Sequence, residues 1–158
     1  MAAFAAAVKI DTFAYLPVQD FGNAYSTFVA QNFGAGEQER IQRGTKTAFV
    51  MSGIFSLIIS AAVFIFAAPL MRIFIAASET QVIAAGVHYL RIEGAFYIGI
   101  GFLFLLYGYY RAIKQAGMSV VLTVLSLGTR VILAYLLSSS IGVIGIWMAI
   151  PIGWGLAD

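Results

Sequence analysis

Cysteine is absent from this chain of 158 residues, and charged residues are scarce. Without cysteine, the chain has neither a disulfide framework nor a thiolate metal site. Only 10% of its residues are charged and 61% are hydrophobic. A soluble domain typically carries about 25% charged residues. The chain therefore lacks the polar surface that a water-soluble protein needs, and we expect a membrane protein.

The sequence also lacks the features that are typical of several other functional classes. The chain has one histidine and a formal net charge of +2, with no basic run. We therefore expect no metal site and no nucleic-acid partner. The patterns HExxH and GxSxG are missing, so we expect no enzyme. The start, MAAFAAAVKID, has no basic region ahead of an apolar run and does not resemble a signal peptide.

Five apolar stretches approach or exceed the length of about 20 residues that a transmembrane helix needs. They cover approximately residues 3–32, 47–68, 82–110, 118–137 and 141–158. The last stretch is still apolar near Asp158, and we expect it to be truncated. The sequence predicts an all-α polytopic membrane protein, with about five transmembrane helices in a single partial domain over residues 1–158.

The basic residues of the short loops predict the orientation in the membrane. Arg40, Arg43 and Lys46 follow the first stretch, and Arg111 and Lys114 follow the third. Cytoplasmic loops are usually the richer ones in lysine and arginine. We therefore expect these two loops in the cytoplasm and the start of the chain outside, in a bacterial cytoplasmic membrane.

The first stretch is unusually polar for a membrane helix. It contains Lys9, Asp11, Gln19, Asp20 and Asn23, with Pro17 at its middle. An aspartate or lysine at mid-bilayer costs roughly 2.5–3.5 kcal/mol. Asp20 is the strongest candidate site residue, because it lies beside Gln19 and shares a helix face with Asn23. Its carboxylate either binds a proton or a cationic drug, or makes a structural salt bridge or a hydrogen bond between helices.

Arg130 lies about halfway along the fourth stretch and is the natural partner of Asp20. Buried charges are normally paired. An Asp20–Arg130 ion pair would serve either as a structural bridge or as a switch that opens when Asp20 is protonated.

A second group of charges lies toward the predicted outer face. Glu93 is a turn or two inside the third stretch, near His88 and Arg91, and Lys9 and Asp11 enter the first stretch at a similar depth. Two interpretations are open: a charged cluster in the ion or substrate pathway, or side chains that extend to the interface. Tyr97 belongs to a set of tyrosines that either stack on aromatic cations or pack.

Three long segments resemble a known family. VQDFGNAYSTFVAQNFGAGEQERIQRG is similar to the second helix of a lobe in multidrug and toxic compound extrusion (MATE) transporters, followed by its charged loop. YLRIEGAFYIGIGFLFLLYGYYRAI resembles the fourth helix of a lobe, and SIGVIGIWMAIPIGW the start of the sixth. The segment KIDTFAYLPVQDFG resembles the sequence of the C-terminal lobe in a bacterial member.

The resemblance implies a MATE-type helical bundle of which the chain covers part of the C-terminal lobe. A complete member has twelve helices in two lobes, and this chain would supply helices eight to eleven and most of twelve. In a sodium-coupled branch an acidic residue lies deep in the tenth helix, but the corresponding position here is near the apolar Ile100. That cation site is therefore not carried over.

The implied function is secondary antiport by alternating access. The family exports drugs and organic cations in exchange for H+ or Na+, with no bound cofactor. The expected partners are the lipid bilayer, cationic or amphiphilic small molecules, and the missing N-terminal lobe. Two alternatives are open: a flippase for lipid-linked or polysaccharide substrates, and a membrane scaffold or subunit that transports nothing. We also expect poor stability of this chain in isolation.

Overall fold

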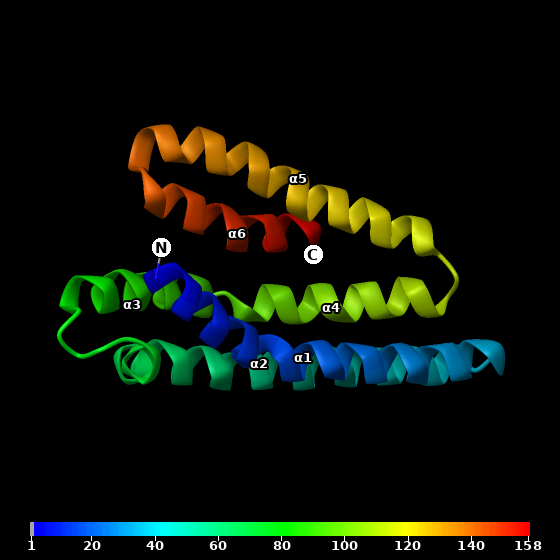
Figure 1. Cartoon of the computed structure of the whole chain (residues 1–158). Helices are drawn as coiled ribbons and strands as arrows, with labels where there is room; N and C mark the ends of the chain where they lie inside the picture. Colours follow the sequence, from blue (N-terminus) through cyan, green and yellow to red (C-terminus); the bar gives the residue numbers. More distant parts are fainter. Residues whose placement is uncertain (1) are drawn as a thin grey trace.

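The computed structural model describes residues 2–158, which form six α-helices and no β-strand (Figure 1). The helices are α1 (Ala2–Gly34), α2 (Gln38–Phe74), α3 (Thr80–Gly94), α4 (Tyr97–Ala112), α5 (Ala116–Ile141) and α6 (Val143–Ala157). Within α2, and over Gly117–Ile141 of α5, the chain is long and apolar enough to cross a membrane. These features confirm the predicted all-α membrane fold.

The stretch 82–110, predicted as one helix, is broken in the structure. Its two parts, α3 and α4, meet at an angle of 51° across Ala95 and Phe96. Gly94, the last residue of α3, packs closely on α2, and a Cβ atom there would lie 3.1 Å from Val63 Cγ1. Together the two helices form a third candidate span, so the described residues contain two or three such spans by length and composition. Whether α1 and the short α6 also cross the membrane stays a prediction.

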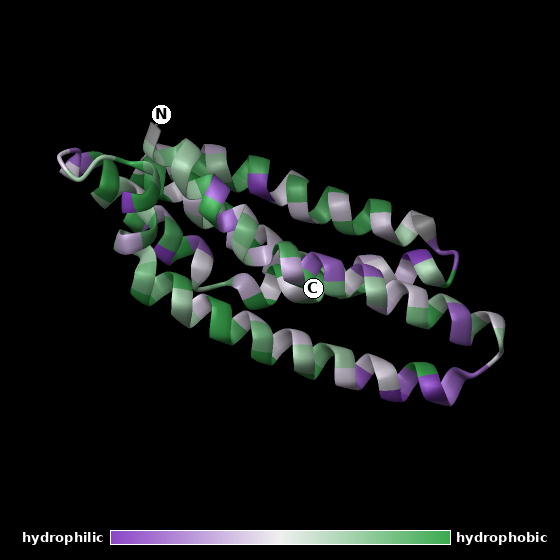
Figure 2. Ribbon diagram, turned by 60° about the horizontal axis from the view of Figure 1, so that its bottom comes forward, coloured by the Kyte–Doolittle hydropathy of each residue, from purple (hydrophilic) through white to green (hydrophobic). Residues whose placement is uncertain are grey.

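The outer faces of the long helices are apolar. On α2, Ile58 and Ile65 are exposed, as are Val124 and Ile132 on α5. Figure 2 shows long hydrophobic stretches along the ribbons, with hydrophilic residues at the connecting loops and at a few places within the helices. Exposed apolar surface of this extent is unfavourable in water and suits a lipid environment.

Small residues bring the inner helices close together. Ser52 and Ser56 of α2 are buried against Gly101 of α4. A Cβ atom on Gly101 would lie 2.7 Å from Ser56 Oγ and 2.9 Å from Ser52 Oγ. Between α1 and α4, a Cβ atom on Gly108 would lie 2.7 Å from the Gly22 carbonyl oxygen. Glycine at these positions sets the spacing between helices.

The connecting loops gather at two ends of the bundle. The α1–α2 and α4–α5 loops lie at one end, on the right of Figure 1, and the α2–α3 and α5–α6 connections lie at the other. The first end carries Arg40, Arg43, Lys46, Arg111 and Lys114. We call it the basic end. This arrangement agrees with the two loops sharing one side of the membrane, while the cytoplasmic assignment stays a prediction.

Candidate functional site

Two acidic residues and a tyrosine meet inside the bundle. Asp11 on α1 is 7% exposed, Glu93 on the last turn of α3 is 0% exposed, and Tyr97 at the start of α4 is 1% exposed. The Tyr97 hydroxyl donates a hydrogen bond of 2.7 Å to Asp11 Oδ1. The bend between α3 and α4 separates Glu93 from Tyr97 along the chain, so both sides of the bend contribute to this acidic site.

The two carboxylates are unequally satisfied. Asp11 accepts the Tyr97 hydrogen bond, whereas neither carboxylate oxygen of Glu93 has a hydrogen-bond partner within the described residues. The charge of Asp11 also acts on Glu93. Burying a charged group without partners is costly, and two like charges repel. The acidic site is therefore suited to take up a proton.

Aromatic residues pack beside the acidic site. Tyr89 is buried one turn before Glu93 on α3. Its ring lies edge-on to Phe4 of α1, with centroids 5.4 Å apart, and to Trp147 of α6, with centroids 5.7 Å apart. These contacts join three helices beside the acidic site. His88 lies beside Trp147 on the exposed side.

The predicted Asp20–Arg130 ion pair does not form. Among the described residues, the only ion pair joins Glu39 and Arg43 on the exposed surface of α2. Asp20 lies on an exposed face of α1, whereas the stem of Arg130 packs on α6. A Cβ atom on Gly153 would lie 2.3 Å from Arg130 Cγ. The pairing prediction was wrong because matching depth along two helices does not decide which faces meet.

Arg130 lies instead between α5 and α6. It lines a small cavity of about 240 Å³ between these helices. Its guanidinium forms no ion pair among the described residues, so the structure does not join it to Asp20 or to the acidic site.

The other candidates divide into two places. Lys9 is exposed, so it does not join Asp11 in the buried site. Gln19 and Asn23 line a polar cavity toward the basic end, where Asn23 Oδ1 accepts a hydrogen bond of 3.0 Å from Arg111 Nη2. Of the predicted charged cluster only Asp11 and Glu93 are buried, whereas His88 and Arg91 are exposed like Lys9. Tyr97 joins the two acids as a hydrogen-bond donor. The sequence indicated this position of Tyr97 only through its spacing of four residues from Glu93, which places two residues on the same face of a helix.

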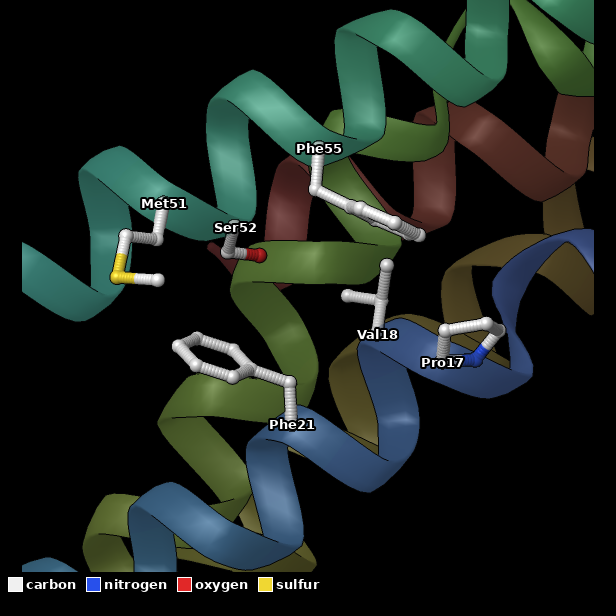
Figure 3. Close-up of a pocket in the computed structure, with 6 residues that line it drawn as sticks. All are labelled: Pro17, Val18, Phe21, Met51, Ser52 and Phe55. Carbon is white, nitrogen blue, oxygen red and sulfur yellow. The ribbon is translucent and has the colours of Figure 1, made fainter.

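A separate cavity of about 250 Å³ opens between α1 and α2 (Figure 3). Figure 3 shows its lining residues, which are Pro17, Val18 and Phe21 on α1 and Met51, Ser52 and Phe55 on α2. The lining is apolar except for the Ser52 hydroxyl. Such a cavity suits the apolar part of an amphiphilic molecule.

Comparisons with known proteins agree with this architecture. The MatE family model matches residues 1–136. The probable multidrug resistance protein YpnP of Bacillus subtilis (strain 168) is 32% identical over 151 residues, covering 93% of this chain and 33% of that protein. This chain therefore spans about one third of that relative.

Solved structures share the fold. A multidrug resistance MATE family transporter in its inward-facing conformation superposes with a TM-score of 0.89 at 21% identity, covering 98% of this chain and 36% of the other. A MOP superfamily transporter from Pyrococcus furiosus gives a TM-score of 0.90 at 22% identity, covering 99% of this chain and 35% of the other. The coverage fits a partial lobe. On the family match and this shared fold, the chain belongs to the MatE family, the multidrug and toxic compound extrusion transporters.

Proposed function

We propose that this chain is part of a two-lobe secondary transporter that exports drugs and organic cations in exchange for H+ or Na+. The observation that carries the proposal is the buried pair Asp11 and Glu93, because it places two acidic side chains away from water. Ionisable residues inside a membrane domain commonly belong to ion or substrate pathways. The acidic character favours a cation over the pyrophosphate group that a lipid-linked flippase would hold.

The proposed mechanism is alternating access. The two lobes rock around a central cavity, and the N-terminal lobe supplies its second wall. A proton or Na+ at the acidic site neutralises the charge that would otherwise attract a cationic substrate. By thermodynamic linkage, ion and substrate then weaken each other's binding to the same extent. The exchange of one for the other follows from this competition.

The bend between α3 and α4 gives the ion site a route to conformational change. Glu93 precedes the bend and Tyr97 follows it, while Asp11 belongs to α1. Ion uptake would change the repulsion between Asp11 and Glu93 and the strength of the Tyr97 hydrogen bond. We therefore propose that ion loading changes how α1 packs against the α3–α4 pair, within the bacterial cytoplasmic membrane.

The test is ion-driven transport by the full-length transporter that carries this chain, in inverted membrane vesicles with a fluorescent organic cation. Glu93→Gln and Asp11→Asn should each abolish transport driven by a pH or Na+ gradient. Asp20→Asn is the matched control, because Asp20 is an exposed acidic residue of α1, the helix that also carries Asp11. Full transport by Glu93→Gln together with loss in Asp20→Asn would overturn this assignment and return Asp20 to the central role.

A further inference from the structure

A polar cleft lies between α1, α4 and α5, away from the acidic site. It has a volume of about 270 Å³ and is lined by Gln19, Asn23, Phe104, Tyr107, Arg111 and Ser119. Four of these side chains carry an amide, a guanidinium or an aliphatic hydroxyl group, and Tyr107 adds a phenol. Most of the hydrogen-bonding groups are therefore donors or can act as donors.

The donors of this cleft are only partly used. Arg111 gives one hydrogen bond, from Nη2 to Asn23 Oδ1 at 3.0 Å, and forms no ion pair within the described part of the chain. A guanidinium carries five N–H donors in a planar fork. The Ser119 hydroxyl is buried without a hydrogen-bond partner in that part of the chain. The amide of Asn23 is held by Arg111 with its oxygen toward the guanidinium, which leaves its NH2 group for another acceptor.

The one charged side chain that lines the cleft is Arg111. No acidic residue is among its lining side chains, and Asp20, next to Gln19, lies on an exposed face of α1 and does not line it. Ser119 belongs to the first turn of α5, and the N-terminus of a helix carries partial positive charge. Arg111 ends α4 at the basic end of the bundle, close in sequence to Lys114.

We propose that this cleft binds a phosphate group. The Arg111 guanidinium matches two phosphate oxygens, and the hydroxyl of Ser119 and the amide of Asn23 supply further donors. The phosphate belongs either to the headgroup of an anionic lipid or to a soluble phosphate compound. Because the cleft joins α1, α4 and α5, a bound phosphate would hold these three helices together at the basic end.

The experiment measures thermal unfolding of the full-length transporter in detergent, with phosphatidylglycerol, phosphatidylcholine or inorganic phosphate added separately. Phosphatidylglycerol or inorganic phosphate should raise the midpoint temperature, and phosphatidylcholine should not. A response to phosphatidylglycerol alone identifies a lipid headgroup, and a response to inorganic phosphate alone identifies a soluble ligand. No response to either phosphate source overturns the proposal.

Variants distinguish the cleft from general attraction to a basic surface. Arg111→Gln should abolish the shift, whereas Arg40→Gln, which removes the same charge at the same end of the bundle, should keep it. An equal shift in both variants would contradict the proposal. Arg111→Lys preserves the charge without the planar fork, and we expect about tenfold weaker binding because it loses a charge-assisted hydrogen bond.

A second substitution avoids the contact between α1 and α4. Ser119→Ala removes a hydroxyl that makes no hydrogen bond within the described residues, so it should leave the unliganded protein folded. Its apparent affinity for the responding ligand should fall several-fold. An unchanged affinity would remove Ser119 from the site, and an unchanged affinity in Arg111→Lys as well would overturn the proposal.

Discussion

At the scale of single residues, Tyr97 is the donor that makes burial of Asp11 tolerable. Its hydroxyl is the hydrogen-bond partner of the Asp11 carboxylate, across 86 positions of sequence. A buried polar group that loses its partner keeps the cost of leaving water. The two residues are therefore coupled through one short contact, and this coupling can be measured.

Tyr97→Phe should lower the free energy of unfolding by about 1–3 kcal/mol, because Asp11 loses its hydrogen-bond partner. Chemical denaturation in detergent measures the change. In the Asp11→Asn background the same substitution should cost less, since an amide side chain is less costly to bury than a carboxylate. Because the amide oxygen of asparagine can also accept this hydrogen bond, equal costs in both backgrounds would mean that the charge of Asp11 adds nothing to it.

The sequence predicted the membership of the acidic site better than the pairing of its charges. Asp11 and Glu93 were expected at similar depth and do meet. Arg130 was expected opposite Asp20, but its stem packs against Gly153 of α6 and it forms no ion pair among the described residues. Depth along a helix can be counted from the sequence, but the direction in which a side chain points depends on how each helix is rotated. That rotation is decided by packing.

At the scale of helices, the positions of the prolines do not indicate the bend between α3 and α4. Pro17, Pro69 and Pro151 all lie inside helices, whereas the 51° bend falls at Ala95 and Phe96. The close contact of Gly94 with Val63 belongs to the packing of two helices. Because this contact is not visible in the sequence, the apolar stretch 82–110 is predicted as one helix, although it folds as two.

The contact between α1 and α4 depends on glycine. Gly108→Val should destabilise the protein by about 1–3 kcal/mol, because its Cβ atom would meet the Gly22 carbonyl oxygen at 2.7 Å. Gly128→Val is the matched control, since no heavy atom outside its own stretch of helix lies within 4 Å of a Cβ atom there. Thermal unfolding in detergent compares the two. A similar loss of stability in both variants would contradict the prediction, because it would reflect only the low helix propensity of valine.

At the scale of the whole molecule, the distribution of charge predicts the orientation of the bundle. The α1–α2 and α4–α5 loops share the basic end, and α2–α3 lies opposite (Figure 1). This chain has no cysteine. Once any cysteines elsewhere in the full-length transporter are replaced, a single introduced cysteine can be labelled to report the side of the membrane on which it lies.

Lys114→Cys should resist a membrane-impermeant maleimide in intact cells and react after permeabilisation, because we expect the α4–α5 loop in the cytoplasm. Glu79→Cys, in the α2–α3 loop, should react in intact cells. Both positions are exposed, so their labelling depends on the side of the membrane. The reverse pattern would place the basic end outside.

The central claim is that the acidic site exchanges its ion for an organic cation. The most direct measurement adds tetraphenylphosphonium to the purified full-length transporter in weakly buffered detergent, and follows pH and the free Na+ concentration. With the acidic site loaded beforehand, the wild type should release roughly one proton or Na+ per cation bound, because the two compete for one site. Glu93→Gln should release none. Release by Glu93→Gln equal to that of the wild type would contradict the account.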